Sequence, residues 1–225
     1  MPRARPSPKP RRKPANSPPA DPAPTGGDDV VELIVGLGNP GPRYADTRHN
    51  AGFAFVERLA AGERLSFKSE SRFHGEVATW HRPHGDVRLL KPLTFMNDSG
   101  RAVQALAAYY RIAPEHILVA HDELDLPPGD IRLKAGGGHG GHNGLRRTIG
   151  ALNSPAFLRL RVGIGHPGAA ALVTPYVLGA PPVDQARLID DAIGSALALM
   201  PRLLAGETAP VMQLLNTRPP RADGP

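Results

Sequence analysis

Side chains that could activate a water molecule occur at four separate places along this 225-residue chain. These places are Asn39 with Tyr44 and His49, then Asn97, then Asp122, and finally His142 with Asn143. A histidine and a carboxylate that meet in one crevice are the usual means of making water nucleophilic, and amide donors can stabilise the oxyanion that forms. Each residue alone also has an ordinary structural explanation, as a helix cap or as part of a solvated turn. The chemistry therefore depends on whether the fold brings them together.

The glycine-rich run 136–144 encloses two histidines three residues apart and has two open interpretations. The histidines could ligate a metal ion together with a carboxylate such as Asp122. Alternatively, the glycines allow the backbone to approach a ligand closely, and the upstream basic residues Arg132 and Lys134 make a phosphate chain the fitting ligand. The residue types favour the second interpretation, so we expect no metal site here.

A second glycine pattern allows an alternative class of protein. Gly36, Gly38 and Gly41 follow an apolar run and match the G-x-G-x-x-G sequence of dinucleotide-binding loops. Pro40 and Pro42, however, remove two backbone donors at the place where a pyrophosphate would bind. A dinucleotide-binding module is therefore the weaker alternative to an enzyme, and an RNA-binding protein without catalytic activity is a third possibility.

The elements that must position these residues alternate between strand-like and helix-like patterns. Strands are expected over 32–37, 76–80, 87–91, 117–120, 131–134 and 160–164, and helices over 47–61, 98–110, 145–152 and 182–204, with a last helical turn at 211–215. This order predicts one α/β domain over residues 30–217, with a twisted mixed, largely parallel β-sheet flanked by α-helices. Most of the polar groups named above follow strands, where α/β sheets bind ligands.

Composition excludes several further classes of protein and of catalytic site. Residues 1–29 hold six Lys or Arg against three Asp, and they are rich in proline with few apolar side chains, so we expect them to be disordered. The same is expected of residues 218–225. The chain has no cysteine and no Gly-x-Ser-x-Gly, which excludes disulfides, a thiolate nucleophile and a nucleophile elbow. No run reaches the ~18 apolar residues of a membrane-spanning helix, so a cytoplasmic protein without membrane contact is expected.

Five separated motifs resemble those of the bacterial-type peptidyl-tRNA hydrolases, in the same order, over about residues 31–216. They are GLGNPGPRYADTRHN (36–50), KPLTFMNDSG (91–100), HDELD (121–125), GGGHGGHNG (136–144) and RLRVGIGHPG (159–168). The resemblance implies an enzyme that hydrolyses the ester between peptide and tRNA, without a cofactor and as a monomer. Two departures are Arg132, where the family often has lysine, and the uncharged 169–171 in a lid-like segment spanning about residues 166–178.

The resemblance also implies a role for each matching residue. His49 would be the catalytic base, Asp122 would orient it and favour its charged form, and Asn39 would act with them on the substrate and water. The expected substrate and tRNA contacts are Tyr44, Met96, Asn97, His142, Asn143, Arg132, Lys134 and Arg161. Of these, the two basic residues of the 131–134 strand would bind tRNA phosphate, and Arg161 matches another position tied to tRNA binding.

Overall fold

A seven-stranded sheet with the order β2-β3-β4-β1-β5-β7-β6 forms the centre of the computed structural model, which describes residues 30–217. The strands are β1 (Leu33–Gly36), β2 (Lys68–Glu70), β3 (Gly75–Trp80), β4 (Val87–Pro92), β5 (Ile117–Glu123), β6 (Ile131–Ala135) and β7 (Leu158–Gly163). The four central strands β4, β1, β5 and β7 run parallel, while β2 and β3 at one edge and β6 at the other pair in antiparallel fashion. The expected mixed, largely parallel α/β sheet is confirmed.

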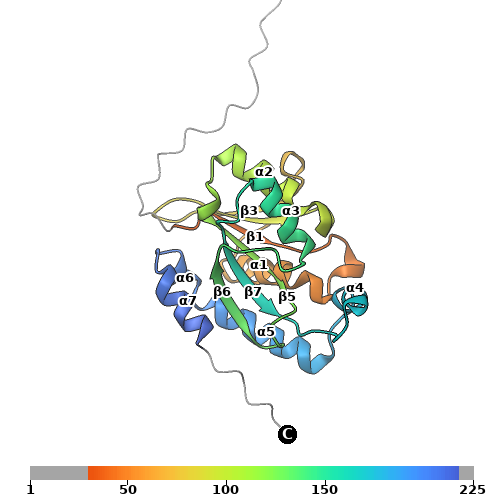
Figure 1. Cartoon of the computed structure of the whole chain (residues 1–225). Coiled ribbons are helices and arrows are strands. Elements are labelled where there is room, and N and C mark those ends of the chain that lie inside the picture. The colour runs from red at the N-terminus through yellow and green to blue at the C-terminus, as the bar shows by residue number, and fades with distance from the viewer. Residues whose placement is uncertain (1–29, 218–225) are drawn as a thin grey trace, which may run out of the picture.

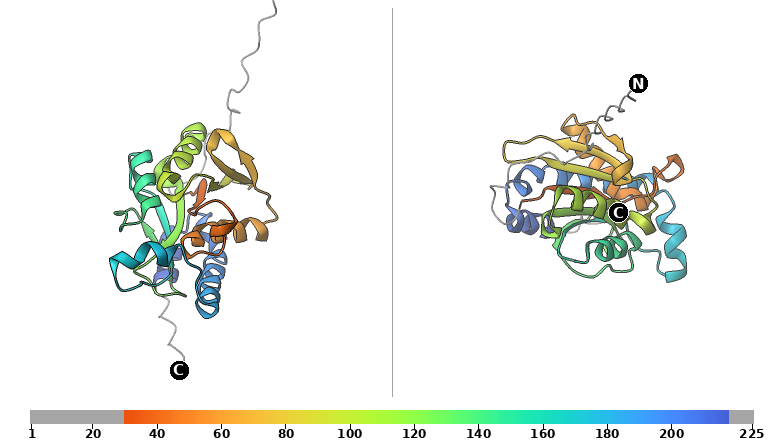
Figure 2. Two further views of the ribbon diagram at one scale, coloured as in Figure 1. Left: turned by 90° about the vertical axis from the view of Figure 1, so that its right-hand side faces the viewer. Right: turned by 90° about the horizontal axis from the view of Figure 1, so that it is seen from above.

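Helices cover both faces of this sheet (Figure 1). They are α1 (Ala51–Gly62), α2 (Ser99–Tyr110), α3 (Asn143–Leu152), α4 (Val173–Val177), α5 (Val183–Leu197), α6 (Met200–Leu203) and α7 (Thr208–Asn216). α2 and α3 pack on one face, and α1, α5, α6 and α7 pack on the other; Figure 2 shows the same layers from two further sides. The short α4 lies at the edge of these layers, beside the helical turn that precedes α1.

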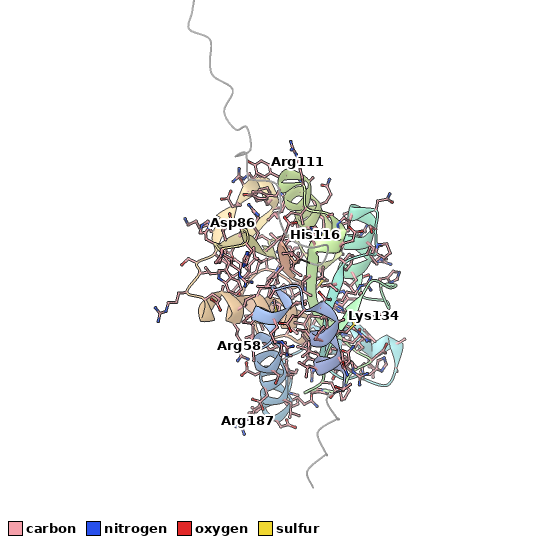
Figure 3. All side chains as sticks on the ribbon, turned by 90° about the vertical axis from the view of Figure 1, so that its left-hand side faces the viewer. Arg58, Asp86, Arg111, His116, Lys134 and Arg187 are labelled. Carbon is pink, nitrogen blue, oxygen red and sulfur yellow. The ribbon has the colours of Figure 1, made fainter. Side chains whose placement is uncertain are left out.

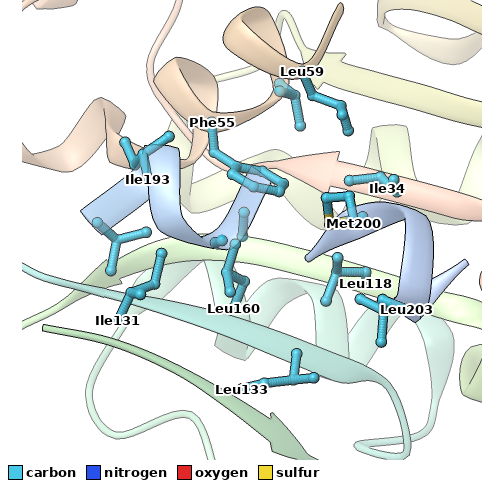
Figure 4. Close-up of a cluster of buried hydrophobic side chains, with 14 of the residues drawn as sticks. Ile34, Phe55, Leu59, Leu118, Ile131, Leu133, Leu160, Ile193, Met200 and Leu203 are labelled. Atoms are coloured by element: carbon cyan, nitrogen blue, oxygen red, sulfur yellow. The ribbon is translucent and has the colours of Figure 1, made fainter. Parts of the chain in front are cut away.

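Alternation along the strands sends neighbouring side chains to the two faces. In β1, Leu33 and Val35 join the cluster under α2 and α3, whereas Ile34 joins the larger cluster under α1 and α5. That larger cluster, shown in Figure 4, brings Phe55 of α1 together with Met200 of α6. Because both faces are covered, β1 and the first four residues of β5 are continuous apolar runs, whereas β4 and β7 also carry basic residues.

Several element boundaries differ from those expected. The helix expected from residue 47 begins at Ala51, after a separate 3-10 turn, Arg48–Asn50. α3 begins at Asn143, two residues earlier than expected, and the helix expected over 182–204 is divided into α5 and α6, with Pro201 in the first turn of α6. β2 and α4 were not expected. β2 is short and polar, and only its pairing with β3 makes it a strand.

The C-terminal helix closes the β6 edge of the sheet through one side chain. Asn216 at the end of α7 accepts a hydrogen bond from the Leu133 amide at 3.0 Å and donates one to the Leu133 carbonyl at 2.9 Å. The carboxamide thus takes the place that a neighbouring strand would occupy.

No helix within residues 30–217 combines the length and apolar composition needed to cross a membrane. The expected disorder of 1–29 and 218–225 concerns residues outside the described range.

Candidate active site

The polar groups predicted from the sequence gather where the central parallel strands end. Asn39 follows β1, Asn97 follows β4, and Asp122 lies near the end of β5, and these three strands are neighbours in the order β4-β1-β5. His49, from the 3-10 turn before α1, meets Asp122: its Nδ1 lies 2.9 Å from Oδ1 and 3.0 Å from Oδ2 of the carboxylate. Parallel β-strands therefore bring together residues 73 positions apart in sequence.

Asp122 binds a second histidine with the same carboxylate. Nε2 of His142 lies 2.9 Å from Asp122 Oδ1, and Nδ1 of His142 accepts a hydrogen bond from the Leu145 amide at the start of α3. Because Nδ1 is an acceptor, the proton of neutral His142 is on Nε2, which donates to the carboxylate. His49 places its Nδ1 against the same carboxylate, which accepts, so Nδ1 of His49 is the donor. The proton of neutral His49 is therefore on Nδ1, and the lone pair of Nε2 can accept a proton.

Burial and charge set the protonation of this cluster. Burial lowers the pKa of His49, but the charge and hydrogen bond of Asp122 outweigh it, so the pKa lies above 6.5. Burial by itself raises the pKa of Asp122, yet the charges and hydrogen bonds of His142 and His49 bring it well below its usual range. Asp122 is therefore ionised, and it holds the imidazole of His49 in one orientation.

His121 is a third histidine in this cluster and one that sequence reasoning did not single out. It is almost fully buried, its Nδ1 donates to the Asp122 carbonyl at 2.7 Å, and its ring lies 5.1 Å from that of His142. Burial first, and then the charge of His142, lower the pKa of His121 to about 3. The residue is consequently neutral at physiological pH.

Asn39 is fixed by the turn that contains it. Its backbone amide donates to Asn50 Oδ1 at 2.8 Å, and Asn50 Nδ2 donates back to the Asn39 carbonyl at 3.0 Å. The side-chain Oδ1 of Asn39 accepts from the Met96 amide at 2.8 Å, so the turn after β1 is tied to the turn after β4. Within residues 30–217 no hydrogen bond occupies Nδ2 of Asn39, which makes this amide the group left to donate. The role of Asn50 was missed because an asparagine beside a histidine has no distinctive pattern.

Asn97 and Asn143 are exposed at the starts of two helices. Asn97 lies in the 3-10 turn Met96–Asp98, which leads into α2. Asn143 is the first residue of α3, and its Oδ1 accepts a hydrogen bond from Arg146 at 2.7 Å. This bond orients the amide of Asn143, and Arg146 was not predicted because it lies one helical turn beyond the motif.

Two aromatic rings pack together at Phe95, the residue that precedes the buried Met96 in the chain. Tyr44 and Phe95 form an edge-to-face pair with ring centroids 6.2 Å apart, and Phe95 is 57% exposed. This exposed ring belongs to the segment between β4 and α2. Phe95 was not singled out from the sequence.

A basic groove lies between α2 and α3, alongside the helix starts that carry Asn97 and Asn143. It is lined by Asp98, Gly100, Arg101, Arg146, Arg147, Gly150 and Ala151. The two helices approach closely because Gly100 has no side chain: a Cβ there would overlap the Arg147 carbonyl oxygen. This groove was not predicted from the sequence, because its arginines come from two different helices.

The glycines of the first motif serve packing. A Cβ on Gly36 would overlap the Gly52 carbonyl oxygen of α1, and a Cβ on Gly38 would overlap the ring of Phe53. The amide of Leu37 is already bound to the Ala120 carbonyl at 2.9 Å. These glycines therefore let α1 approach the end of β1, and the dinucleotide-binding alternative has no support from the geometry.

Four basic residues share one face of the β6–β7 pair. Arg132 lies opposite Arg161 and Lys134 lies opposite Arg159 in the antiparallel register. Arg132 pairs with Asp130 at 3.4 Å and Arg161 with Glu123 at 2.9 Å, while Lys134, labelled in Figure 3, is exposed and has no carboxylate partner among residues 30–217.

Arg159, which was not predicted as a site residue, is buried beneath the glycine-rich loop. Its guanidinium donates to the carbonyls of Gly137 and Gly138 and lies 4.8 Å from the ring centroid of Phe157. It fixes the loop that leads to His142, and thereby the start of α3.

His49, Asp122 and His142 also have the composition of a metal site, with ligand atoms within 4.8 Å of one another. Their geometry is already that of hydrogen bonds, because both histidine nitrogens that face the carboxylate lie 2.9 Å from one oxygen. A metal would have to displace the proton on each of these nitrogens and lie between atoms that now touch. The arrangement fits an acid–base cluster better than a metal centre.

Comparison with known proteins places this site in a family context. The sequence model described as Peptidyl-tRNA hydrolase matches residues 33–222. The peptidyl-tRNA hydrolase of Pseudomonas aeruginosa (strain LESB58) is 54% identical over 190 residues, which are 84% of this chain and 98% of that protein. That of Methylococcus capsulatus is 56% identical over 187 residues, covering 83% of this chain and 100% of the relative.

Solved structures agree with the sequence comparison. The crystal structure of peptidyl-tRNA hydrolase from Acinetobacter baumannii superimposes with a TM-score of 0.81 at 50% identity, covering 85% of this chain and 98% of that one. A structure of the Arg119Gln mutant of the same enzyme gives a TM-score of 0.82 at 50% identity, over 84% and 96% of the two chains.

Proposed function

Because this chain belongs to the peptidyl-tRNA hydrolase family, we propose that it cleaves the ester of peptidyl-tRNA with a water molecule deprotonated by His49. Hydrolysis of peptidyl-tRNA is the activity of the family, and it releases the tRNA for reuse. The proposal assigns this reaction to the residues of the cluster at the carboxyl ends of β1, β4 and β5.

The pairing of His49 with Asp122 is the observation that carries the proposal. Nδ1 of His49 is held by the ionised carboxylate, so Nε2 presents a lone pair to a water molecule. As the proton arrives, the positive charge that forms on the imidazole is stabilised by Asp122. General-base assistance of this kind accelerates hydrolysis by about 10²- to 10⁴-fold.

The proposed steps conserve atoms and charge. His49 Nε2 takes one proton from water while the water oxygen bonds to the ester carbonyl carbon, which gives a tetrahedral oxyanion and an imidazolium. Amide donors stabilise the oxyanion, and Nδ2 of Asn39, together with the exposed amides of Asn97 and Asn143, supports this role. The oxyanion then expels the ribose oxygen, which receives the proton from His49.

The tRNA moiety is the proposed partner of the basic face formed by Arg132, Lys134 and Arg161. Phosphate groups bind arginine and lysine through charge-assisted hydrogen bonds, and the exposed Lys134 is the member free of an acidic partner within residues 30–217. Tyr44, Met96 and His142 border the reacting groups. The proposal includes action as a monomer, and the substrate supports a cytoplasmic location.

Replacement of His49 tests the assignment. His49→Ala should reduce release of tRNA from a blocked peptidyl-tRNA by about 10²- to 10⁴-fold with the melting temperature little changed. The unaltered enzyme should keep its rate with EDTA present, because the proposed steps need no metal. His84→Ala, in the exposed β3–β4 loop, is the matched control. Near-normal hydrolysis by His49→Ala would refute the role of His49, and loss of the rate with EDTA would refute metal independence.

A further inference from the structure

A buried arginine lies next to His49 and holds a segment distant in sequence. Arg48 is only 8% exposed, and its Nη1 donates to the carbonyls of Tyr176, Gly179 and Ala180 at 3.2, 3.3 and 3.1 Å. Its Nη2 reaches Gln185 Oε1 at 3.3 Å, and its backbone amide donates to Gly179 at 3.1 Å. The guanidinium therefore fastens the end of α4 to the 3-10 turn that carries His49.

The planar guanidinium suits this place. It lies 4.0 Å from the ring centroid of Tyr176 and at the same time donates to carbonyls beyond the last turn of α4. A cation is favourable at a helix C-terminus, and arginine can stack on a ring and donate in its own plane, which an ammonium group cannot do. Burial of an arginine costs free energy unless its donors are satisfied. Nη1 and Nη2 of Arg48 are satisfied by these contacts, whereas its buried Nε has no hydrogen-bond partner within residues 30–217.

These contacts complete a closed circuit through the catalytic pair. The Tyr176 hydroxyl donates to the Ile164 carbonyl at 2.6 Å, just after β7, and the Ile164 amide donates to the Glu123 carbonyl at 3.0 Å, next to Asp122. The circuit thus runs from His49 through Arg48, Tyr176, Ile164 and Glu123 to Asp122, and the bond between His49 and Asp122 closes it. Each member limits how far the turn of His49 can move relative to β5.

We propose that Arg48 is a positioning residue for the hydrolysis: by binding the α4 end and Tyr176, it holds His49 at hydrogen-bonding distance from Asp122. This inference rests on the proposed role of His49. It assigns Arg48 no contact with the substrate. A small displacement of the turn lengthens the contact between His49 and Asp122, which costs rate because the base is no longer aligned.

Three variants distinguish the contributions of the Arg48 charge, of its planar donors and of the Tyr176 hydroxyl. Arg48→Gln removes the charge and most donors, and it should lower kcat by about 10- to 100-fold with a much smaller change in KM. Arg48→Lys keeps the charge without the planar donors and should recover part of kcat. Tyr176→Phe keeps the ring under the guanidinium, removes only the bond to Ile164, and should reduce kcat less than Arg48→Gln.

The acid limb of the pH profile distinguishes positioning from loss of stability. The groups that face His49 are Asp122 from β5 and His142 from the start of α3, with His121 behind them. Asp122 raises the pKa of His49, so a looser contact in Arg48→Gln should move the acid limb of kcat/KM to lower pH. A variant that is merely less stable would keep the limb in place.

Arg58→Gln is the matched control. Arg58 also joins the region of α1 to a later helix, through Asp190 of α5 at 2.5 Å, but it belongs to no circuit with His49. The Arg58→Gln variant should have an unchanged kcat and an unchanged acid limb of kcat/KM. A folded Arg48→Gln with unchanged kcat and acid limb would overturn the proposal, and if that variant does not fold, the same result in Tyr176→Phe would do so. Failure of the proposed function would differ, because then the unaltered chain itself would not hydrolyse peptidyl-tRNA.

Discussion

At the scale of the residue, one carboxylate organises the candidate site. Asp122 accepts hydrogen bonds from His49 and His142, and its backbone carbonyl accepts one from His121. The sequence predicted His49 and Asp122 as partners through a family resemblance, and spacing alone could not, because 73 positions separate them. His121 was missed because a histidine inside an apolar strand has the same appearance whether it is a core residue or part of a polar network.

Replacement of Asp122 should cost less than replacement of His49. Asp122→Asn keeps the shape, and its carbonyl oxygen can still accept from both histidines, but it removes the negative charge that they face. The pKa of His49 should fall, since the charge that raises it is gone, so the acid limb of kcat/KM should move to lower pH while kcat drops. A pH–rate series on peptidyl-tRNA measures both effects.

Asp125→Asn is the control for this comparison, because Asp125 is an exposed neighbour on the same turn. It should leave the pH profile where it is. If Asp122→Asn shifted the limb upward, or lowered the rate more than His49→Ala, Asp122 would not act by charge and orientation.

At the scale of the element, the start of α3 is held by residues that the sequence did not reveal. Arg159 of β7 binds the Gly137 and Gly138 carbonyls, His142 caps the helix, and Arg146 orients Asn143. The glycine motif predicted a close approach of the backbone to a ligand, which stays a prediction, and it gave no sign of the arginine from another strand that holds the loop. The helix start was placed two residues late because His142 is not a usual capping residue.

The β6 edge carries the prediction on tRNA binding. Lys134→Ala should raise KM, and it should reduce the slope of log KM against log salt by about 0.7 to 0.9 for each phosphate contact that it removes. Arg132→Ala should have a smaller effect, because Arg132 already pairs with Asp130. Lys68→Ala makes the same charge change in β2, at the opposite edge of the sheet. Equal salt slopes for Lys134→Ala and Lys68→Ala would place the tRNA contacts elsewhere.

At the scale of the whole molecule, the sequence predicted every strand of the sheet except the edge strand β2. Continuous apolar runs identified β1 and β5 because helices bury both faces of the centre, and alternation of apolar and basic residues identified β7. β2 has no apolar pattern and depends on β3 for its conformation, and α4 is a five-residue helix whose position depends on Arg48. Long-range contacts such as these leave no local signal in the sequence.

The buried His121 should make global stability depend on pH. Its pKa is about 3 in the folded protein and near 6.5 in the unfolded chain, so the unfolded state binds the additional proton between these values. The free energy of unfolding should therefore decrease by up to about 1.4 kcal/mol for each pH unit below 6.5. The raised pKa of His49 changes the free energy of unfolding only above pH 6.5, and the lowered pKa of Asp122 changes it only below pH 3.8.

Urea unfolding between pH 7 and pH 5 measures this slope. His121→Asn retains a side-chain donor without an ionisable ring, so its free energy of unfolding should vary less with pH. His84→Asn, at an exposed position, should retain the original slope. If His121→Asn retained it as well, the pH dependence would come from other groups.

The hydrogen bonds between Asn216 and Leu133 have a consequence for solubility. An edge strand with a free row of amides and carbonyls is a template on which another chain can add a strand. Here the carboxamide of Asn216 occupies both polar groups of Leu133, and the lysine at position 134 adds a charge beside them. An incoming strand would have to displace the end of α7 and bury that charge. The last residue of α7 thus covers one outward-facing residue of β6, which hinders addition of another strand at that point of the edge.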